Sequence, residues 1–169
     1  MARRELRFDV ARVGALALLV ALVVGAAILG TSMNQYSGGS AVEPHATHHS
    51  WWFNYLCDLA GELAVNGASN ARGAATARVG MLIMSVDVAL FWLLLPVSIG
   101  TRGAAARLIQ IGGCLSAVGV AIVPVTTGAL HAPALFLSLG PGLVAGIVGF
   151  TALVRANRRS SMLVIATGA

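Results

Sequence analysis

Long apolar stretches joined by short polar connections dominate the pattern of hydrophobic and polar positions along the chain. Each stretch matches the roughly 20 apolar residues that a helix needs to cross a bilayer. The predicted spans are about 10–33, 75–99, 107–126 and 133–154, and a partial fifth run occupies 161–169. The pattern therefore predicts an all-α membrane protein, a single domain over 1–169 built as a bundle of four full transmembrane helices plus a partial fifth.

The composition supports the same class. Of the 169 residues, 57% are hydrophobic and only 10% are charged, whereas roughly a quarter of the residues in a soluble domain are charged. The net charge of +5 comes from arginines that cluster at the ends of apolar runs and not along one face, so nucleic acid is not an expected partner. The expected partners are membrane lipids, a membrane protein or a second copy of the chain.

Arginine positions predict the orientation in the membrane. Nine arginines fall on one side of the predicted spans: Arg3, Arg4, Arg7, Arg12, Arg102, Arg107, Arg155, Arg158 and Arg159. The other side has only Arg72 and Arg78. Since cytoplasmic loops carry the excess of basic residues, we expect a multi-pass protein of the cell membrane with its N-terminus in the cytoplasm.

The longest polar stretch, 34–74, is expected on the outer face. Within 50–66, polar side chains recur every four residues, a spacing that shares one face of a helix: Ser50, Asn54, Asp58 and Glu62. Aromatic side chains start the same segment: Trp51, Trp52, Phe53 and Tyr55. This pattern predicts an interfacial amphipathic helix on the outer leaflet, with the rings at headgroup level.

The candidate binding residues of this segment are Trp51, Trp52, Asn54 and Glu62. A plainer interpretation stays open, in which the helix simply lies on the leaflet and its two carboxylates, Asp58 and Glu62, are solvated or cap a helix end.

Three histidines in the polar stretch have the spacing of a possible metal site. His45, His48 and His49 place imidazoles within one turn of each other, and such groups can converge on Zn or Cu. Because no Cys or carboxylate stands at a firm ligand spacing beside them, a polar loop without a cofactor is the main expectation.

Two further titratable residues are candidates for chemistry. His131 lies in the turn between two predicted spans, where it could act as a general base oriented by Asp58; the alternative is a histidine that caps a helix turn. Asp87 lies near the middle of the 75–99 span. A charge there is costly, so we expect Asp87 to face the bundle interior, with a proton relay as one possible role.

Short motifs resemble a known family. Asn34 to Gly39, the run Trp52 to Ala60, and Val123-Pro124 through His131 resemble the prokaryotic membrane proteins grouped as domain of unknown function 998. Those proteins are distantly similar to a eukaryotic group that includes an autophagy modulator and a GPI-anchor lipid-remodelling factor. The resemblance implies that Asn54, Asp58 and His131 match family positions, although Cys57 and Ala60 depart from the signature.

The sequence favours binding of lipid or a membrane partner through the aromatic polar stretch. A lipid-headgroup hydrolase or transferase that uses His131 and Asp58 is the alternative, and a small transporter that uses Asp87 is the third hypothesis. Whether the protein is an enzyme is left open by the sequence.

Overall fold

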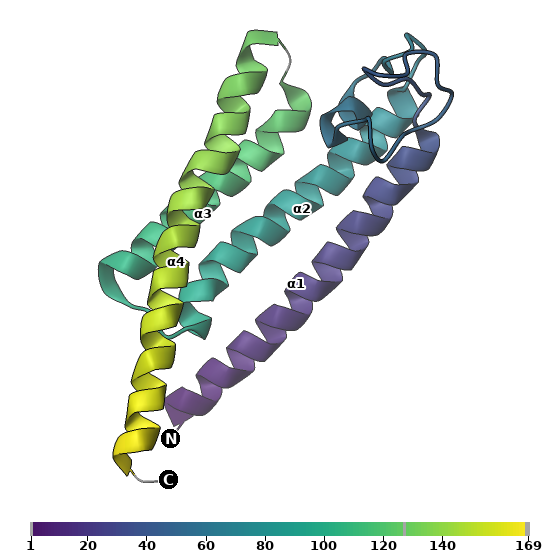
Figure 1. Ribbon diagram of the computed structural model, residues 1–169. Coiled ribbons are helices and arrows are strands. Elements are labelled where there is room, and N and C mark those ends of the chain that lie inside the picture. Colours follow the sequence, from purple (N-terminus) through teal and green to yellow (C-terminus); the bar gives the residue numbers. More distant parts are fainter. Residues whose placement is uncertain (1, 127, 168–169) are drawn as a thin grey trace.

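The regular elements of the computed structural model are helices (Figure 1). It describes residues 2–126 and 128–167, and side chains over 11–126 and 129–157. The long helices are α1 (Ala2–Gln35), α2 (Ala71–Ser98), α3 (Gly103–Ile122) and α4 (His131–Thr167). Short 3-10 helices are η1 (Leu56–Ala60), η2 (Val123–Val125) and η3 (Gly128–Leu130).

Within the described part of the chain, four helical segments are long and apolar enough to cross a membrane. They are Ala11–Gln35, Ala71–Ser98, Gly103–Val125 and His131–Asn157. The prediction of four helices long and apolar enough to span a membrane is confirmed, with ends that differ from the predicted ones by up to four residues. The chain is therefore compatible with an integral, multi-pass membrane protein.

The apolar run at 161–169 does not begin a separate fifth helix over the residues that the structure describes. Helix α4 continues without interruption from His131 to Thr167, and residues 168–169 lie outside the described part. The physical reason is that the arginines after Val154 interrupt the hydropathy but not the helix, since no Pro or Gly follows Gly149 until Gly168.

The helices pack in chain order. Helix α1 packs against α2, α2 against α3, and α3 against α4. Small residues allow the close approach of α1 and α2: a Cβ at Gly25 would lie 2.7 Å from the Met84 sulfur, and one at Gly80 would lie 2.9 Å from Leu29 Cγ. Gly25 and Gly80 therefore let the two helices approach closely.

Polar contacts tie α3 to both of its neighbours. The Ser85 hydroxyl of α2 donates a hydrogen bond to the Ala117 carbonyl at 2.6 Å, and the Ser116 hydroxyl donates to the Ser138 carbonyl of α4. A Cβ at Gly119 would lie 2.3 Å from the Ser138 backbone nitrogen. Helices α3 and α4 therefore touch through their backbones.

The segment between α1 and α2 folds into a compact structure that we call the polar cap, residues 36–70. It lies at one end of α1 and α2 (Figure 1). The interfacial helix predicted over 50–66 is absent, and turns followed by η1 take its place. Side chains of Asn54 and Asp58 bond to nearby backbone, and such local bonds compete with a helix.

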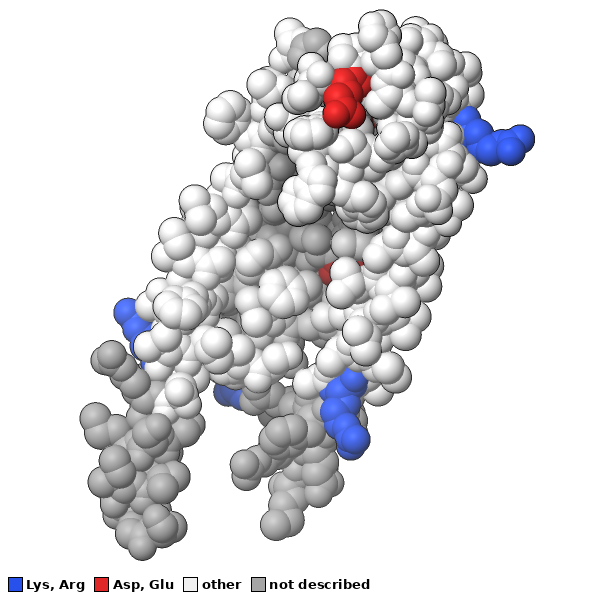
Figure 2. Space-filling view, turned by 45° about the vertical axis from the view of Figure 1, so that its right-hand side comes forward, with Lys and Arg blue, Asp and Glu red and all other residues white. Residues whose placement is uncertain are grey.

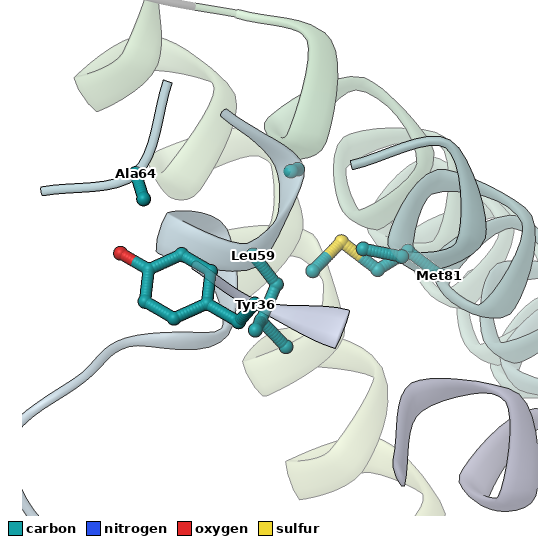
Figure 3. Close-up of a cluster of buried hydrophobic side chains, with 6 residues drawn as sticks. Tyr36, Leu59, Ala64 and Met81 are labelled. Carbon is teal, nitrogen blue, oxygen red and sulfur yellow. The ribbon is translucent and has the colours of Figure 1, made fainter. Parts of the chain in front are cut away.

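A small core fixes the polar cap onto the helix ends. Its buried members come from the cap and from α2: Tyr36, Leu59, Ala60, Ala64, Ala77 and Met81 (Figure 3). Leu59 of η1 is fully buried, and Met33 of α1 packs against the same cluster. This apolar contact holds η1 against the ends of α1 and α2.

Candidate functional site

Asn54 is the polar centre of the cap. Its amide nitrogen donates to the Gly39 carbonyl at 2.7 Å and to Asp58 Oδ2 at 3.1 Å, while its oxygen accepts a bond from the Ser50 N–H at 2.9 Å. The predicted four-residue series Ser50, Asn54 and Asp58 is thus connected, but through a turn and not along a helix face. Asn54 already makes three bonds within the chain.

Asp58 starts η1. Its Oδ2 accepts the Tyr55 N–H at 2.8 Å as well as the Asn54 amide, the position that a carboxylate takes when it caps a helix N-terminus. The negative charge of Asp58 also acts on its surroundings. After burial, which is the larger cause, it contributes to the raised pKa values of Tyr36 and Cys57.

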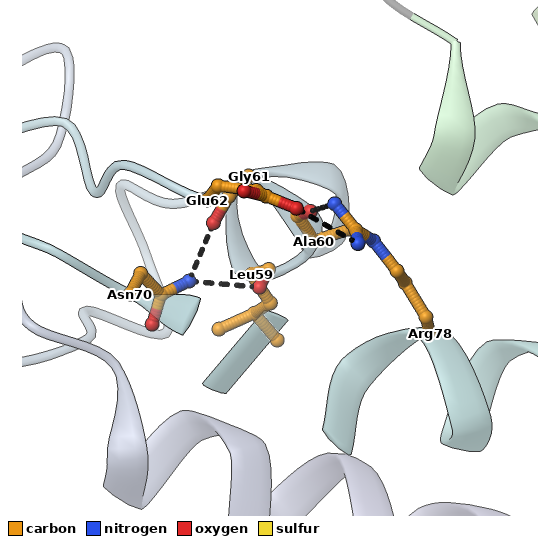
Figure 4. Close-up of polar contacts among 6 residues, drawn as sticks. All are labelled: Leu59, Ala60, Gly61, Glu62, Asn70 and Arg78. Carbon is orange, nitrogen blue, oxygen red and sulfur yellow. Dashed lines mark hydrogen bonds and ion pairs between the residues drawn. The ribbon is translucent and has the colours of Figure 1, made fainter. Parts of the chain in front are cut away.

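A second set of contacts holds the far end of η1 to α2 (Figure 4). The buried Asn70 donates from its amide to the carbonyls of Leu59 and Gly61, both at 2.9 Å. Arg78 donates to the Ala60 carbonyl at 3.0 Å and forms an ion pair with Glu62 at 3.3 Å. Glu62, a predicted binding residue, is therefore paired with α2.

Tyr36 links the cap to α1. Its hydroxyl donates to the Gly39 carbonyl at 3.3 Å and accepts the Val65 N–H at 3.1 Å. Gly38 and Gly39, which follow Tyr36 after Ser37, have φ values of 109° and 84°, a region that only glycine adopts readily. The chain can therefore turn back tightly at the end of α1.

The aromatic side chains project from the cap instead of filling it. Trp51 is 74% exposed, Trp52 90% and Tyr55 72%, and Phe53 is exposed as well. We call Trp51, Trp52, Phe53 and Tyr55 the aromatic patch. Exposed large rings close together on a polar cap mark an interaction surface.

A pocket of about 440 Å³ lies beside the aromatic patch, between the cap and the end of α1. We call it the cap pocket. Its α1 wall is formed by Gly30, Met33 and Asn34, and its cap wall by residues that include Thr47, His49 and Trp51. The walls carry both polar and apolar groups, as expected for a site that receives an amphiphilic molecule.

His49 stands between two aromatic rings in this pocket. Its ring is edge-to-face with Tyr36 at 5.8 Å and with Trp51 at 5.9 Å between centroids. Both ring nitrogens are buried without a hydrogen-bond partner. Burial lowers the pKa of the His49 imidazole, although the Asp58 charge opposes this shift, so the imidazole is neutral near pH 7.

The three predicted metal-site histidines do not converge. His45 and His48 are exposed, whereas His49 packs between rings. Over the described part of the chain, no three His, Cys, Asp or Glu side chains are grouped so that they could hold a metal ion. The Zn or Cu hypothesis has no geometric support in these residues.

His131 begins α4, and its Nδ1 lies 3.1 Å from the Thr126 carbonyl oxygen. This contact is the one expected of a histidine that closes a helix turn. Among the residues with described side chains, no hydrogen bond or ion pair joins His131 to Asp58. The hydrolase or transferase hypothesis therefore lacks the contact on which it was based.

Asp87 faces a second, larger cavity of about 910 Å³ between the helices. We call it the intramembrane cavity. The Oδ1 atom of Asp87 is buried and has no hydrogen-bond partner among the described residues. The expectation that Asp87 faces the inside of the bundle agrees with this position.

Sequence reasoning missed Tyr36, Asn70 and Arg78 as residues that build the site. Asn70 had a usable signal, because asparagine directly before a helical run is a favoured N-cap residue. Tyr36 and Arg78 had none, since their partners lie 29 and 18 positions away in the chain.

Comparison with protein-family models, curated proteins and solved structures finds no match to this chain. The resemblance to domain of unknown function 998 therefore stays a prediction.

Proposed function

We propose that the protein is a multi-pass protein of the cell membrane that binds membrane lipid at the outer leaflet through its aromatic patch. The orientation rests on the nine arginines on one side of the spans and the two on the other. With the N-terminus in the cytoplasm, the polar cap is at the outer surface.

The position of Trp51 carries the proposal. Trp51 lines the cap pocket together with Gly30 and Met33 of α1, both inside the span Ala11–Gln35. Gly30 is five residues before Gln35, or about 7.5 Å along the helix axis. An exposed indole at that depth contacts headgroups and the first acyl carbons, the region that Trp and Tyr favour.

Lipid fits this surface better than a catalytic substrate does. Asn54 and Asp58, the polar residues that a reaction would need, already form hydrogen bonds within the cap. The rings of Trp51 and Trp52, in contrast, have large exposed areas. Rings with one polar edge bury their apolar body in lipid and keep that edge hydrated. The cap pocket then accommodates part of a headgroup beside Trp51.

Replacing both Trp51 and Trp52 by alanine should weaken phospholipid binding about tenfold or more. Loss of the two rings removes at least about 1.4 kcal/mol of apolar contact, a tenfold change in affinity. The measurement is native mass spectrometry of the purified protein in detergent, titrated with phosphatidylethanolamine.

Two controls accompany this experiment. Val42→Ala removes another exposed apolar side chain of the cap, 65% exposed, and should leave binding unchanged. His131→Ala should also leave it unchanged. Unaltered binding by the Trp51→Ala/Trp52→Ala variant would contradict lipid binding through the patch, and loss of binding by His131→Ala alone would favour a site at the α4 end.

A further inference from the structure

The intramembrane cavity is bordered by all four long helices. Leu18 of α1, Asp87 of α2, Ser116 of α3 and Leu143 of α4 are among its lining residues. Helices α1 and α4 make no extensive contact with each other in the described part of the chain. Figure 2 shows the molecule hollowed between the helices, with acidic atoms recessed in the hollow and most basic side chains toward the lower end.

Among the residues whose side chains the structure describes, Asp87 is the sole charged residue that lines this cavity. Its Oδ1 is buried without a partner, and no hydrogen bond or ion pair to Asp87 occurs among the described side chains. The two serines in the lining do not compensate: Ser116 donates to the Ser138 carbonyl and Ser138 donates to the Leu135 carbonyl. A charged carboxylate at this depth is costly unless a cation or a hydrogen-bond donor pairs with it.

Aromatic rings stand next to this carboxylate. Phe91 and Trp92 both line the cavity and pack edge-to-face with centroids 5.0 Å apart. Ring faces attract cations, most strongly where water is excluded. The remaining walls are leucine, valine, methionine and glycine, so they favour an apolar body.

These features select among possible occupants. A bare metal ion needs several oxygen ligands, and the side chains that line this cavity offer only the Asp87 carboxylate and the hydroxyls of Ser116 and Ser138. An acyl chain alone would leave Asp87 unpaired. A cation with hydrophobic substituents satisfies the carboxylate, the rings and the apolar walls together.

We propose that the intramembrane cavity binds a hydrophobic organic cation, paired with Asp87 and in contact with Phe91 and Trp92. The volume of about 910 Å³ is within the range of sites for small organic molecules. The proposal is independent of lipid binding at the aromatic patch, because the two sites share no residue.

Trp92 provides the readout for a direct test. The chain has three tryptophans, so the Trp51→Phe/Trp52→Phe background leaves Trp92 as the sole indole. Titration of this protein in detergent with tetraphenylphosphonium should quench Trp92 fluorescence saturably. Asp87→Asn in the same background should weaken the binding at least about tenfold, since a charge-assisted contact is lost.

Two controls define the result. Glu62→Gln changes a carboxylate of the polar cap and should leave tetraphenylphosphonium binding unchanged. Triphenylphosphine oxide, which has similar rings but no net charge, should bind weakly and equally to both forms. Equal binding of the cation by the Asp87→Asn variant, or equal binding of the neutral compound and the cation, overturns the proposal.

Absence of saturable quenching in the wild-type cavity also overturns it. Size-exclusion chromatography with light scattering then decides whether a helix of a second copy fills the cavity, because Asp87→Asn would in that case shift the oligomeric state. Circular dichroism of each variant confirms that the helices are retained.

Discussion

Replacing Gly119 by valine should lower the free energy of unfolding by about 3 kcal/mol, the upper part of the range for overpacking. A Cβ at this position would lie 2.3 Å from the Ser138 nitrogen and 2.5 Å from its Cα. Both are backbone atoms, so relief requires α4 to move as a whole away from α3. The contact between Ser116 and the Ser138 carbonyl would be lost in that movement.

The measurement for this variant is unfolding by sodium dodecyl sulfate in mixed micelles, followed by circular dichroism. Gly140→Ala is the matched control, because a Cβ at Gly140 of α4 meets nothing within 4 Å and alanine favours the helix. Equal midpoints for Gly119→Val and Gly140→Ala would show that α3 and α4 do not touch through their backbones.

Replacing Asn70 by alanine should destabilise the polar cap by about 2–4 kcal/mol. The variant leaves the carbonyls of Leu59 and Gly61 without the amide that now serves both, and each buried group left unpaired costs about 1–3 kcal/mol. Since Asn70 Oδ1 has no partner, the loss comes from the donor alone. Asn70→Asp should therefore fail to rescue the cap, because a carboxylate supplies no donor at neutral pH.

Hydrogen exchange of the η1 amides, residues 56–60, measures this effect locally. Exchange should accelerate strongly in Asn70→Ala while the amides of α3 remain protected, because α3 does not rest on Asn70. Asn34→Ala is the control, since its side chain is exposed and makes none of these bonds. Wild-type protection of η1 in Asn70→Ala would contradict the role assigned to Asn70.

The membrane helices could be predicted from the sequence because length and hydropathy alone determine whether a helix can span a bilayer. The ends of these helices were harder to predict from the sequence. Helix α2 begins at Ala71 and not near residue 75. Its first turn is closed because the Asn70 carbonyl accepts a hydrogen bond from the Ala74 N–H. The Thr76 hydroxyl also donates to the Arg72 carbonyl, so polar residues are part of the first turns of this helix. Hydropathy reports burial in lipid, whereas helix ends depend on backbone hydrogen bonds.

The polar cap shows where pattern reasoning fails. The four-residue spacing of Ser50, Asn54 and Asp58 did indicate residues that interact, but the contacts form in a turn closed by side-chain bonds to backbone. The four-residue spacing puts side chains on one face only if the backbone is helical. Contacts such as Tyr36 to Val65 come from chain folding over distances that periodicity does not describe.

The candidate site residues likewise include some that the sequence could identify and some that it could not. The sequence identified Trp51, Trp52 and Asp87 by residue type and by position along the chain. In the structure Trp51 lines the cap pocket, Asp87 lines the intramembrane cavity, and Trp52 is exposed on the cap. The pairing of His131 with Asp58 required a distance that sequence does not contain. The functional candidates that remain are the exposed rings of the aromatic patch and the Asp87 carboxyl, whose Oδ1 has no hydrogen-bond partner among the described residues.

Lipid binding by the aromatic patch is best tested by measuring how deep Trp51 and Trp52 lie in the membrane. Trp92→Phe leaves Trp51 and Trp52 as the fluorescent indoles, and the protein is reconstituted into vesicles containing lipids with a nitroxide at the headgroup, near the top of the acyl chain or near its end. We expect strong quenching by the first two labels, weak quenching by the third and little quenching by aqueous iodide. Quenching by iodide alone, with none by the lipid labels, would place the rings in water and contradict lipid binding by the aromatic patch.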